Sequence, residues 1–298
     1  MIAALPYFGE SLALLTALVW ALAVILFKKS GETVHPIGLN LFKDLLAVVL
    51  LLPTLWLFGE SLTPDAAAAD YGLLLLSGAL GIGISDTFFF MCLNRLGAGL
   101  TAIVDCFYSP FIIGLSFLWL GERLSILQGF GVVLIISAIL TASQKKGRGD
   151  LAGRDLILGI LFGVLAMLTV AVSIVIVKPL LERSSLLWVS EIRLVGGSIV
   201  LLIVLLFHPR RRSIISSIFS VKSRFYTLAG SFTGSYLALI LWLAGMKFTQ
   251  VSTAAALNQT STIFVFVFAA VFLREPINLQ RTIGITLAVI GVFMVMFG

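Results

Sequence analysis

The sequence predicts an all-α membrane protein, with ten transmembrane helices arranged as two inverted five-helix repeats around a central cavity. Of its 298 residues, 60% are hydrophobic and 11% are charged, whereas a soluble domain carries about a quarter charged residues. Apolar stretches of about 20 residues, the length of a membrane-spanning helix, recur between short polar connections along the chain. The two halves of the chain also resemble each other, which predicts the repeat.

The predicted spans extend from one helix-breaking segment to the next. They cover residues 11–28, 36–58, 71–93, 99–120, 125–143, 155–177, 187–207, 225–246, 251–273 and 279–297. Two longer polar loops, at 144–155 and 208–224, interrupt the series, and the first of them divides the chain in half. We therefore expect a first repeat at 1–143, a cytoplasmic linker at 144–154 and a second repeat at 155–298.

The repeat is visible as an internal similarity. The segment LGERLSILQGFG at Leu120 aligns with LREPINLQRTIG at Leu273, 153 residues later, and Lys43 aligns with Arg193, 150 residues later. Because each half contains five helices, an odd number, the second half must enter the membrane in the opposite sense. Inverted repeats of this kind are typical of secondary transporters, which bind substrate near the membrane midplane between the repeats.

Basic residues are concentrated in alternate loops, fourteen in the odd-numbered loops and four in the even-numbered ones. Cytoplasmic loops of membrane proteins are enriched in Lys and Arg. We therefore expect the odd loops to be cytoplasmic and both termini to lie outside the inner membrane. The first ten residues lack the positive charge of a secretory signal, so we expect that the first helix is not cleaved off and remains in the mature protein.

Charge and cysteine content exclude other classes of protein. The net charge is +6, but the basic residues are scattered through short loops, so no nucleic-acid partner is expected. Cys92 and Cys106 lie within apolar segments without flanking ligands, which predicts neither a disulfide nor a metal site. No cofactor is expected.

Several patterns occur in both halves. The first half contains Trp20 to Lys28, Pro36 followed by Lys43, and Gly121-Glu122 followed by Gly131; the second contains Arg193, Glu275, Gly284 and Gly291. In these residues the chain resembles the ten-helix EamA-type branch of the drug/metabolite transporter superfamily, over nearly its whole length. It departs from that pattern at Ser137-Ala138 and at Arg274, where the pattern has Gly. The resemblance implies a carrier of small organic solutes, commonly an exporter of amino acids or related metabolites, driven by an ion gradient or by exchange.

Ionisable residues within the predicted spans are the candidate site. A charge at the bilayer centre costs at least about 2.5 to 3.5 kcal/mol, so it usually faces a cavity or a partner. Those residues are Lys43, Asp44, Asp86, Asp105, Glu191 and Arg193. Thr101, Asp105 and Tyr108 share one helix face, and Pro110 is predicted to kink that helix. Asp105 there either binds an amine or a proton, or forms a buried ion pair with Lys43.

The equivalent positions of Lys43 and Arg193 favour one role performed once in each half. That role is either recognition of a carboxylate or phosphate, or structural pairing with Asp86 or Asp105 and with Glu191. Glu191 and Arg193 are two residues apart and cannot face the same way on a helix, so each is expected to pair with another helix or with water.

Asn258 aligns with Asp105 at the displacement of 153. An amide on one side of a cavity and a carboxylate on the other suit a zwitterionic or polar solute, although such amides also join helices structurally. Trp20, Tyr236 and Trp242 are candidates to line the cavity, because aromatic faces are common in small-molecule sites.

The residues and the resemblance together predict a secondary transporter that moves a small polar, amino-acid-like metabolite by alternating access, and export is the direction that the resemblance implies. The expected substrate-binding residues are Trp20, Lys43, Asp105, Tyr108, Glu191, Arg193, Tyr236 and Asn258. If transport is coupled to an ion, protons are the candidate ion, and Asp86 and Asp105 are the candidate proton-coupling residues. The expected partners are the small-molecule substrate and the lipid bilayer.

Other functions remain open. A carrier of drugs or lipophilic cations would favour carboxylates without matching bases, and a carrier of phosphate esters or nucleotide sugars would use the bases more heavily. An intramembrane enzyme needs a nucleophile with a base or a metal, but His35 and His208 lie at span ends and no HExxH or GxSxG motif occurs. A scaffold would leave the intramembrane charges without a role. We expect no catalytic residues.

Overall fold

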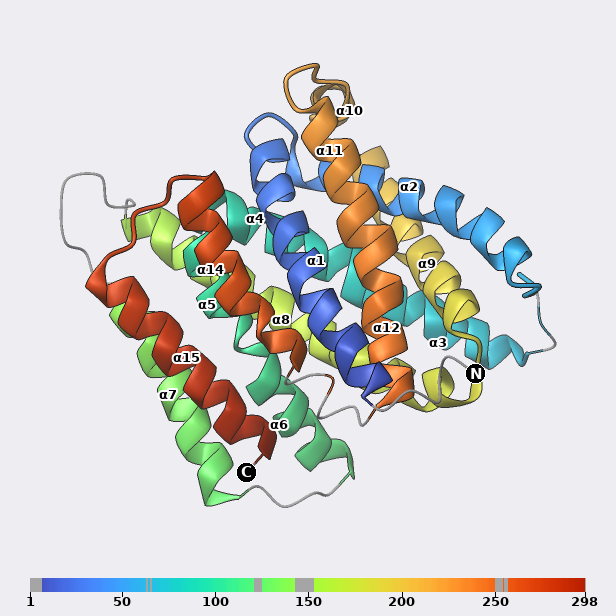
Figure 1. The fold of residues 1–298 in the computed structure, drawn as a ribbon. Helices are drawn as coiled ribbons and strands as arrows, with labels where there is room; N and C mark the ends of the chain where they lie inside the picture. The colour runs from blue at the N-terminus through green and yellow to red at the C-terminus, as the bar shows by residue number, and fades with distance from the viewer. Residues whose placement is uncertain are drawn as a thin grey trace.

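The computed structural model describes residues 7–62, 64, 66–120, 125–142, 153–249, 254 and 257–297, and within these ranges every regular element is a helix (Figure 1). Eight helices of the described chain are long and apolar enough to span a membrane, and Ile126–Ala142 and Leu257–Phe272 form two shorter apolar helices. The predicted all-helical membrane class is confirmed. Gly121, Glu122 and residues 144–152 of the predicted linker lie outside the described residues.

The helices occupy the predicted apolar stretches. In the first half they are α1 (Phe8–Ser30), α2 (Pro36–Leu57), α3 (Ala68–Gly78), the π-helix η2 (Ala79–Ile84), α4 (Ser85–Leu96), α5 (Ala98–Asp105), α6 (Tyr108–Leu120) and α7 (Ile126–Ala142). In the second half they are α8 (Gly153–Arg183), α9 (Leu186–Phe207), α10 (Arg211–Ile218), α11 (Arg224–Ser231), the π-helix η3 (Phe232–Ala238), α12 (Leu239–Phe248), α14 (Ser261–Phe272) and α15 (Leu279–Phe297).

Corresponding helices begin at corresponding residues. His35 caps α2, because its Nδ1 accepts a hydrogen bond from the amide of Ile37 at 3.3 Å. Ser185, 150 residues later, caps α9, because its hydroxyl accepts from the amide of Trp188 at 3.4 Å. A side-chain acceptor at this position satisfies a backbone donor that has no partner within the helix. The two caps fix where α2 and α9 enter the fold.

Two long helices contain π-helical turns, which the sequence did not predict. One joins α3 to α4 through η2, and the other joins α11 to α12 through η3, which begins 153 residues later. The side-chain amide of Asn40 on α2 donates to the carbonyls of Ile82 and Gly83, at 3.0 and 2.9 Å. These bonds give two carbonyls of the widened turn a side-chain donor from another helix. Such turns are frequent at functional sites.

The predicted kink near Pro110 is a break between α5 and α6 at residues 106 and 107. A proline ring clashes with the carbonyl four residues earlier, which here belongs to Cys106. The break falls between Asp105, the last residue of α5, and Tyr108, the first residue of α6.

The first helix of each half packs against helices of the other half. Helix α1 packs against α12 and α14, α8 packs against α4 and α6, α2 packs against α9, and α7 packs against α15 (Figure 1). At the crossing of α7 and α15, a Cβ added to Gly131 would lie 2.6 Å from the carbonyl oxygen of Gly291. One added to Gly284 would lie 3.1 Å from the carbonyl oxygen of Ala138. The repeated glycines therefore allow these two helices to approach closely.

The segment between α9 and α11, expected as a polar loop at 208–224, contains the short helix α10. This part of the prediction is corrected by the structure. Ile214 of α10 is buried against Ile37 and Leu41 of α2 and Leu201 and Leu205 of α9. That apolar contact holds a helix within a segment whose other residues are mostly polar.

Candidate functional site

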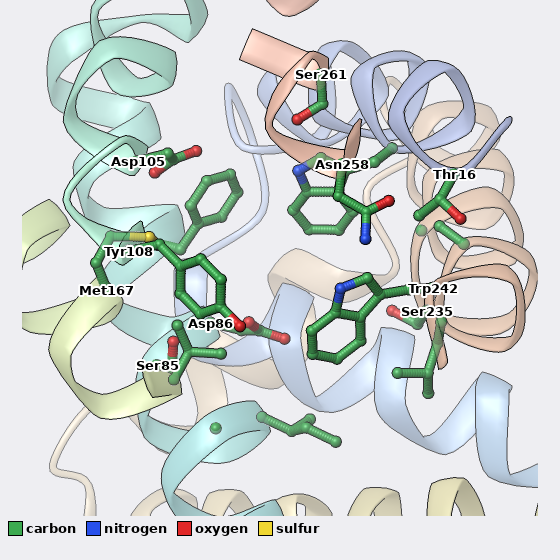
Figure 2. Close-up of a pocket in the computed structure, with 18 of the residues that line it drawn as sticks. Thr16, Ser85, Asp86, Asp105, Tyr108, Met167, Ser235, Trp242, Asn258 and Ser261 are labelled. Carbon is green, nitrogen blue, oxygen red and sulfur yellow. The ribbon is translucent and has the colours of Figure 1, made fainter. Parts of the chain in front are cut away.

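A cavity of about 230 Å3 lies between the halves of the chain (Figure 2). Its walls come from α1, α2, η2 and α4 together with the α5–α6 break, and from α8, α9, η3, α12 and the residues before α14. Of the 23 lining residues, 13 are apolar, aromatic or glycine, and ten have polar or charged side chains. This composition is typical of small-molecule binding sites.

The lining residues are related by the displacement that relates the two halves. Ten pairs lie 150 or 153 residues apart: Ala17 and Met167, Trp20 and Val170, Lys43 and Arg193, Gly81 and Gly234, Ile82 and Ser235, Ser85 and Ala238, Asp86 and Leu239, Phe89 and Trp242, Asp105 and Asn258, and Tyr108 and Ser261. Each half therefore contributes the same positions of its helices to the cavity. Both π-helical turns contribute residues to the wall.

Nine residues are expected to bind substrate or to couple protons, and seven of them lie in the cavity wall: Trp20, Lys43, Asp86, Asp105, Tyr108, Arg193 and Asn258. Figure 2 shows Asp86, Asp105, Tyr108 and Asn258 around the cavity, together with Trp242. The structure thus brings together side chains that are up to 238 residues apart in the sequence.

Glu191 and Tyr236 do not line the cavity. Glu191 is 1% exposed and lies on α9 two residues before Arg193, on a different face of the helix. The hydroxyl of Tyr236 is 2.8 Å from the hydroxyl of Thr54 on α2, and its ring packs against Phe232. Tyr236 therefore contributes to the contact between η3 and α2.

Lys43 is held by two carboxylates. Its Nζ lies 2.6 Å from Oδ1 of Asp44 and 2.7 Å from Oδ2 of Asp86, and both Lys43 and Asp44 are buried. Of the alternatives that the sequence left open, the structure selects Asp86 as the partner of Lys43 on another helix. Lys43 therefore has two counter-ions within the protein.

Asp105 does not pair with Lys43. Its Oδ1 is buried and has no hydrogen-bond partner among the described residues. Thr101, expected on the same face, instead donates to the carbonyl of Gly97 at 2.6 Å and does not line the cavity. Asp105 and Tyr108 reach the cavity from either side of the break between α5 and α6.

Arg193 is 1% exposed and makes one side-chain hydrogen bond. Its Nη2 donates to the hydroxyl of Ser173 on α8 at 3.1 Å, while Nε and Nη1 have no partner in the described chain. The hydroxyl of Ser173 in turn donates to the carbonyl of Ser77 at 2.8 Å. Gly81 leaves room for this contact, because a Cβ there would lie 2.2 Å from the Ser173 hydroxyl. The guanidinium is therefore positioned but only partly satisfied.

Asn258 has both side-chain polar atoms buried without a partner among the described residues. Its neighbour Gln259 donates to the hydroxyl of Ser109 at 3.3 Å. A buried amide without partners is costly in a folded protein, so an unpartnered amide in a cavity wall suits contact with a polar ligand or water.

Several lining residues were missed by sequence reasoning. Thr16, Ser85, Met167 and Ser235 carry no charge and resemble ordinary helix-packing residues in the sequence. Ser235 had a detectable signal, since it lies 153 residues after Ile82 and beside the Gly234 counterpart of Gly81.

Among the described residues, no group of three or more His, Cys, Asp or Glu side chains is placed to hold a metal ion. Cys92 and Cys106 are buried free thiols. The thiol of Cys106 lies 3.7 Å from the hydroxyl of Thr262, within the helix packing.

Comparison with known proteins extends along nearly the whole chain. The model of the EamA-like transporter family matches it twice, at residues 7–144 and 157–297. A protein of Archaeoglobus fulgidus, named an uncharacterized transporter, is 22% identical over 285 residues, which cover 96% of both chains. The uncharacterized transporter YvbV of Bacillus subtilis is 26% identical over 230 residues, which cover 75% of this chain and 71% of YvbV.

A solved crystal structure shares the fold. Its TM-score is 0.68 at 18% sequence identity, and the match covers 95% of this chain and 96% of the other. The helical architecture therefore also occurs in a protein of distant sequence.

Proposed function

Because the chain belongs to the EamA-like transporter family, we propose that it is a secondary transporter that exports a small polar, amino-acid-like metabolite across the inner membrane. The observation that carries this proposal is the cavity, whose walls are contributed in pairs by the two halves of the chain. Its relatives are named as transporters, which also favours a carrier over an enzyme.

The proposed architecture is ten membrane spans in two inverted repeats, 1–143 and 155–298, with the cytoplasmic linker 144–154 between them. The displacement that relates the lining pairs, the two π-helical turns and the reciprocal packing of helices supports this arrangement. When two inverted repeats exchange conformations, the cavity between them opens first to one side of the membrane and then to the other. Alternating access is the proposed mechanism, with the odd loops in the cytoplasm and both termini outside.

The proposed substrate is small and carries charges of both signs. Arg193 has guanidinium N–H groups without partners, and Asp105 has a carboxylate oxygen without a partner in the described chain. Asn258 adds an unpartnered amide, while Trp20 and Tyr108 add aromatic faces. A zwitterion satisfies the two unpartnered charges together, whereas a purely apolar solute leaves both buried and unpaired, at a cost.

Protons are the proposed coupling ion, and Asp105 is the better candidate for the coupling residue. Asp86 is held by Lys43 at 2.7 Å, so adding a proton to it would break an ion pair. Asp105 has no such pair in the described residues. Protonation of Asp105 removes a charge from the cavity wall, which lowers the cost of the conformational exchange across the membrane.

A carrier of lipophilic cations is the second candidate. The rings of Trp20, Tyr108 and Trp242 in the cavity wall favour it, because aromatic faces attract cations. The unpartnered guanidinium of Arg193 in the same wall opposes it, because a cationic solute would be repelled.

The deciding experiment is counterflow into proteoliposomes loaded with a pool of amino acids or with a pool of organic cations, with and without a pH gradient. We expect saturable uptake of one or more labelled amino acids above the level in protein-free liposomes. The variant Glu32→Gln, which removes an exposed carboxylate, controls for reconstitution and is expected to behave as the wild type. Uptake confined to organic cations would refute the amino-acid assignment and favour the carrier of lipophilic cations. No uptake of either pool would refute the proposed function.

A further inference from the structure

The two cations of the cavity wall occupy equivalent positions but have different surroundings. Lys43 has two counter-ions in its own half, with Asp44 at 2.6 Å and Asp86 at 2.7 Å from its Nζ. Arg193, the equivalent residue of the second half, has no carboxylate within ion-pair distance among the residues that the structure describes. This difference is unexpected if the two residues do the same work.

The difference is encoded in the sequence. The position equivalent to Asp44 in the second half is Leu194, 150 residues later, and the position equivalent to Asp86 is Leu239, 153 residues later. Both leucines line the cavity. Each half therefore places a cation at the same site, but only the first half also provides the carboxylates that neutralise it.

The guanidinium of Arg193 is held in a position to bind a ligand. Nη2 is fixed by Ser173 at 3.1 Å, while Nε and Nη1 are buried in the wall without partners. Guanidinium groups bind carboxylates through two parallel N–H···O bonds, and a buried arginine with unsatisfied donors costs free energy until such a partner arrives. Ser173 and Gly81 thus act as positioning residues for this cation.

We propose that Arg193 is the site that binds the carboxylate of the transported solute. The solute then supplies in the second half the counter-ion that Asp44 and Asp86 supply in the first. This inference rests on the proposed transport function and narrows its substrate class. A single cation beside Leu194 and Leu239, with no carboxylate within ion-pair distance in the described chain, matches one negative charge, which favours a monoanionic carboxylate over a phosphate dianion.

The first test measures binding by thermal unfolding of the full chain in detergent, so that it does not depend on transport. The probes are a pool of free standard amino acids, a matched pool of their carboxamides, which lack the carboxylate, and inorganic phosphate. We expect the free amino acids to raise Tm and the other two probes to leave it unchanged. No shift with free amino acids, an equal shift with carboxamides or a larger shift with phosphate would overturn the proposal.

The second test supplies the missing counter-ion within the chain. Leu239→Asp places a carboxylate at the position equivalent to Asp86, where it is expected to neutralise Arg193. We expect it to bind free amino acids about tenfold more weakly than Leu239→Asn, which adds similar bulk without charge. Equal affinity of the two variants would overturn the proposal. Both variants retain Arg193, so the comparison does not require the removal of a buried arginine, which could prevent folding.

The two proposals fail in different ways. If the wild type moves neither amino acids nor organic cations in proteoliposomes, the transport function fails, whatever the binding experiments give. If the wild type moves amino acid carboxamides as fast as free amino acids, transport stands and the carboxylate site at Arg193 is refuted.

Discussion

Glu275 caps helix α5 from the other half of the chain, because its Oε1 lies 2.7 Å from the amide nitrogen of Ala98. Its Oε2 accepts from the amide of Gly99 at 3.1 Å. The first backbone amides of a helix have no partner within it, and a carboxylate there also interacts favourably with the helix dipole. Glu275, the acidic residue of the second copy of the repeated motif, therefore has a structural role. It fixes the start of α5, the helix of the first half that ends at Asp105.

Glu275→Ala is expected to reduce the free energy of unfolding by about 2 kcal/mol, because it leaves two helix amides without an acceptor. Reversible unfolding in mixed detergent measures this change. Arg281→Gln is the matched control, since Nη1 of Arg281 lies 3.6 Å from the same carboxylate and the pair is partly exposed. We expect that control to change stability by less than about 0.5 kcal/mol, and a larger loss there than in Glu275→Ala would contradict the capping role.

Removing Lys43 is expected to destabilise the protein strongly. Lys43→Met leaves Asp44 buried without its counter-ion, and breaking a buried ion pair from one side costs about 3 to 5 kcal/mol. The double variant Lys43→Met/Asp44→Leu removes both buried charges and leaves only the partly exposed Asp86 without its counter-ion, so it is expected to recover part of that loss. Thermal unfolding of the single and double variants tests this, and a double variant less stable than Lys43→Met would show that the pair is not coupled in this way.

The glycines of α3 provide a second matched comparison. A Cβ on Gly78 would lie 1.9 Å from the backbone oxygen of Arg193, so Gly78→Ala must separate α3 from α9 and is expected to cost about 3 kcal/mol. A Cβ on Gly72 meets nothing within 4 Å, so Gly72→Ala is expected to stabilise the same helix by about 0.5 to 1 kcal/mol. Opposite shifts in Tm are the predicted result, and shifts of the same sign would contradict this packing.

The membrane helices were predictable because their length and polarity are set by the bilayer, and these properties are local in the sequence. The π-helical turns were not, because they depend on contacts from other helices, such as the bonds from Asn40 to the carbonyls of Ile82 and Gly83. The break after Asp105 lies between these cases. Pro110 carries a local signal for it, although the sequence suggested a kink where the structure has a break.

The site was predictable where charge identified it. Lys43, Asp86 and Arg193 were found because a charge within the membrane requires a cavity or a partner. Uncharged lining residues such as Met167 carry no signal that separates them from packing residues. Tyr236 was misplaced because the wall is formed there by a π-helix, in which Ser235 faces the cavity and Tyr236 contacts Thr54.

The pH dependence of stability has a predicted source at His35, in the turn before α2. Partial burial and the positive charges of His208 and Arg210 lower the pKa of His35 from its ordinary value of 6.5. The unfolded chain therefore takes up the proton first as the pH falls. The contribution of neutral His35 to stability is complete above pH 6.5 and is lost as the pH falls below that value toward the lowered pKa.

His35→Asn is expected to retain the cap of α2, because Asn is also a good acceptor at that position, and to remove the titration. Between about pH 7.5 and pH 5, the Tm of the wild type should fall further than the Tm of this variant. Equal falls would assign the pH dependence to other groups.

Asp105→Asn is expected to separate accumulation from exchange. The variant should fold as the wild type does, because Oδ1 of Asp105 has no hydrogen-bond partner in the described chain and the amide has nearly the same shape. It cannot take up a proton, so proteoliposomes should lose pH-driven accumulation of amino acids. Counterflow should persist with a higher KM for the amino acid, because the neutral amide still lines the cavity but attracts the amine of a zwitterion less strongly. Asp155→Asn, at the exposed start of α8, is the control and should retain both activities. Accumulation at the wild-type level in Asp105→Asn would exclude Asp105 as the coupling residue, and loss of all counterflow in a folded variant would assign it to substrate binding alone.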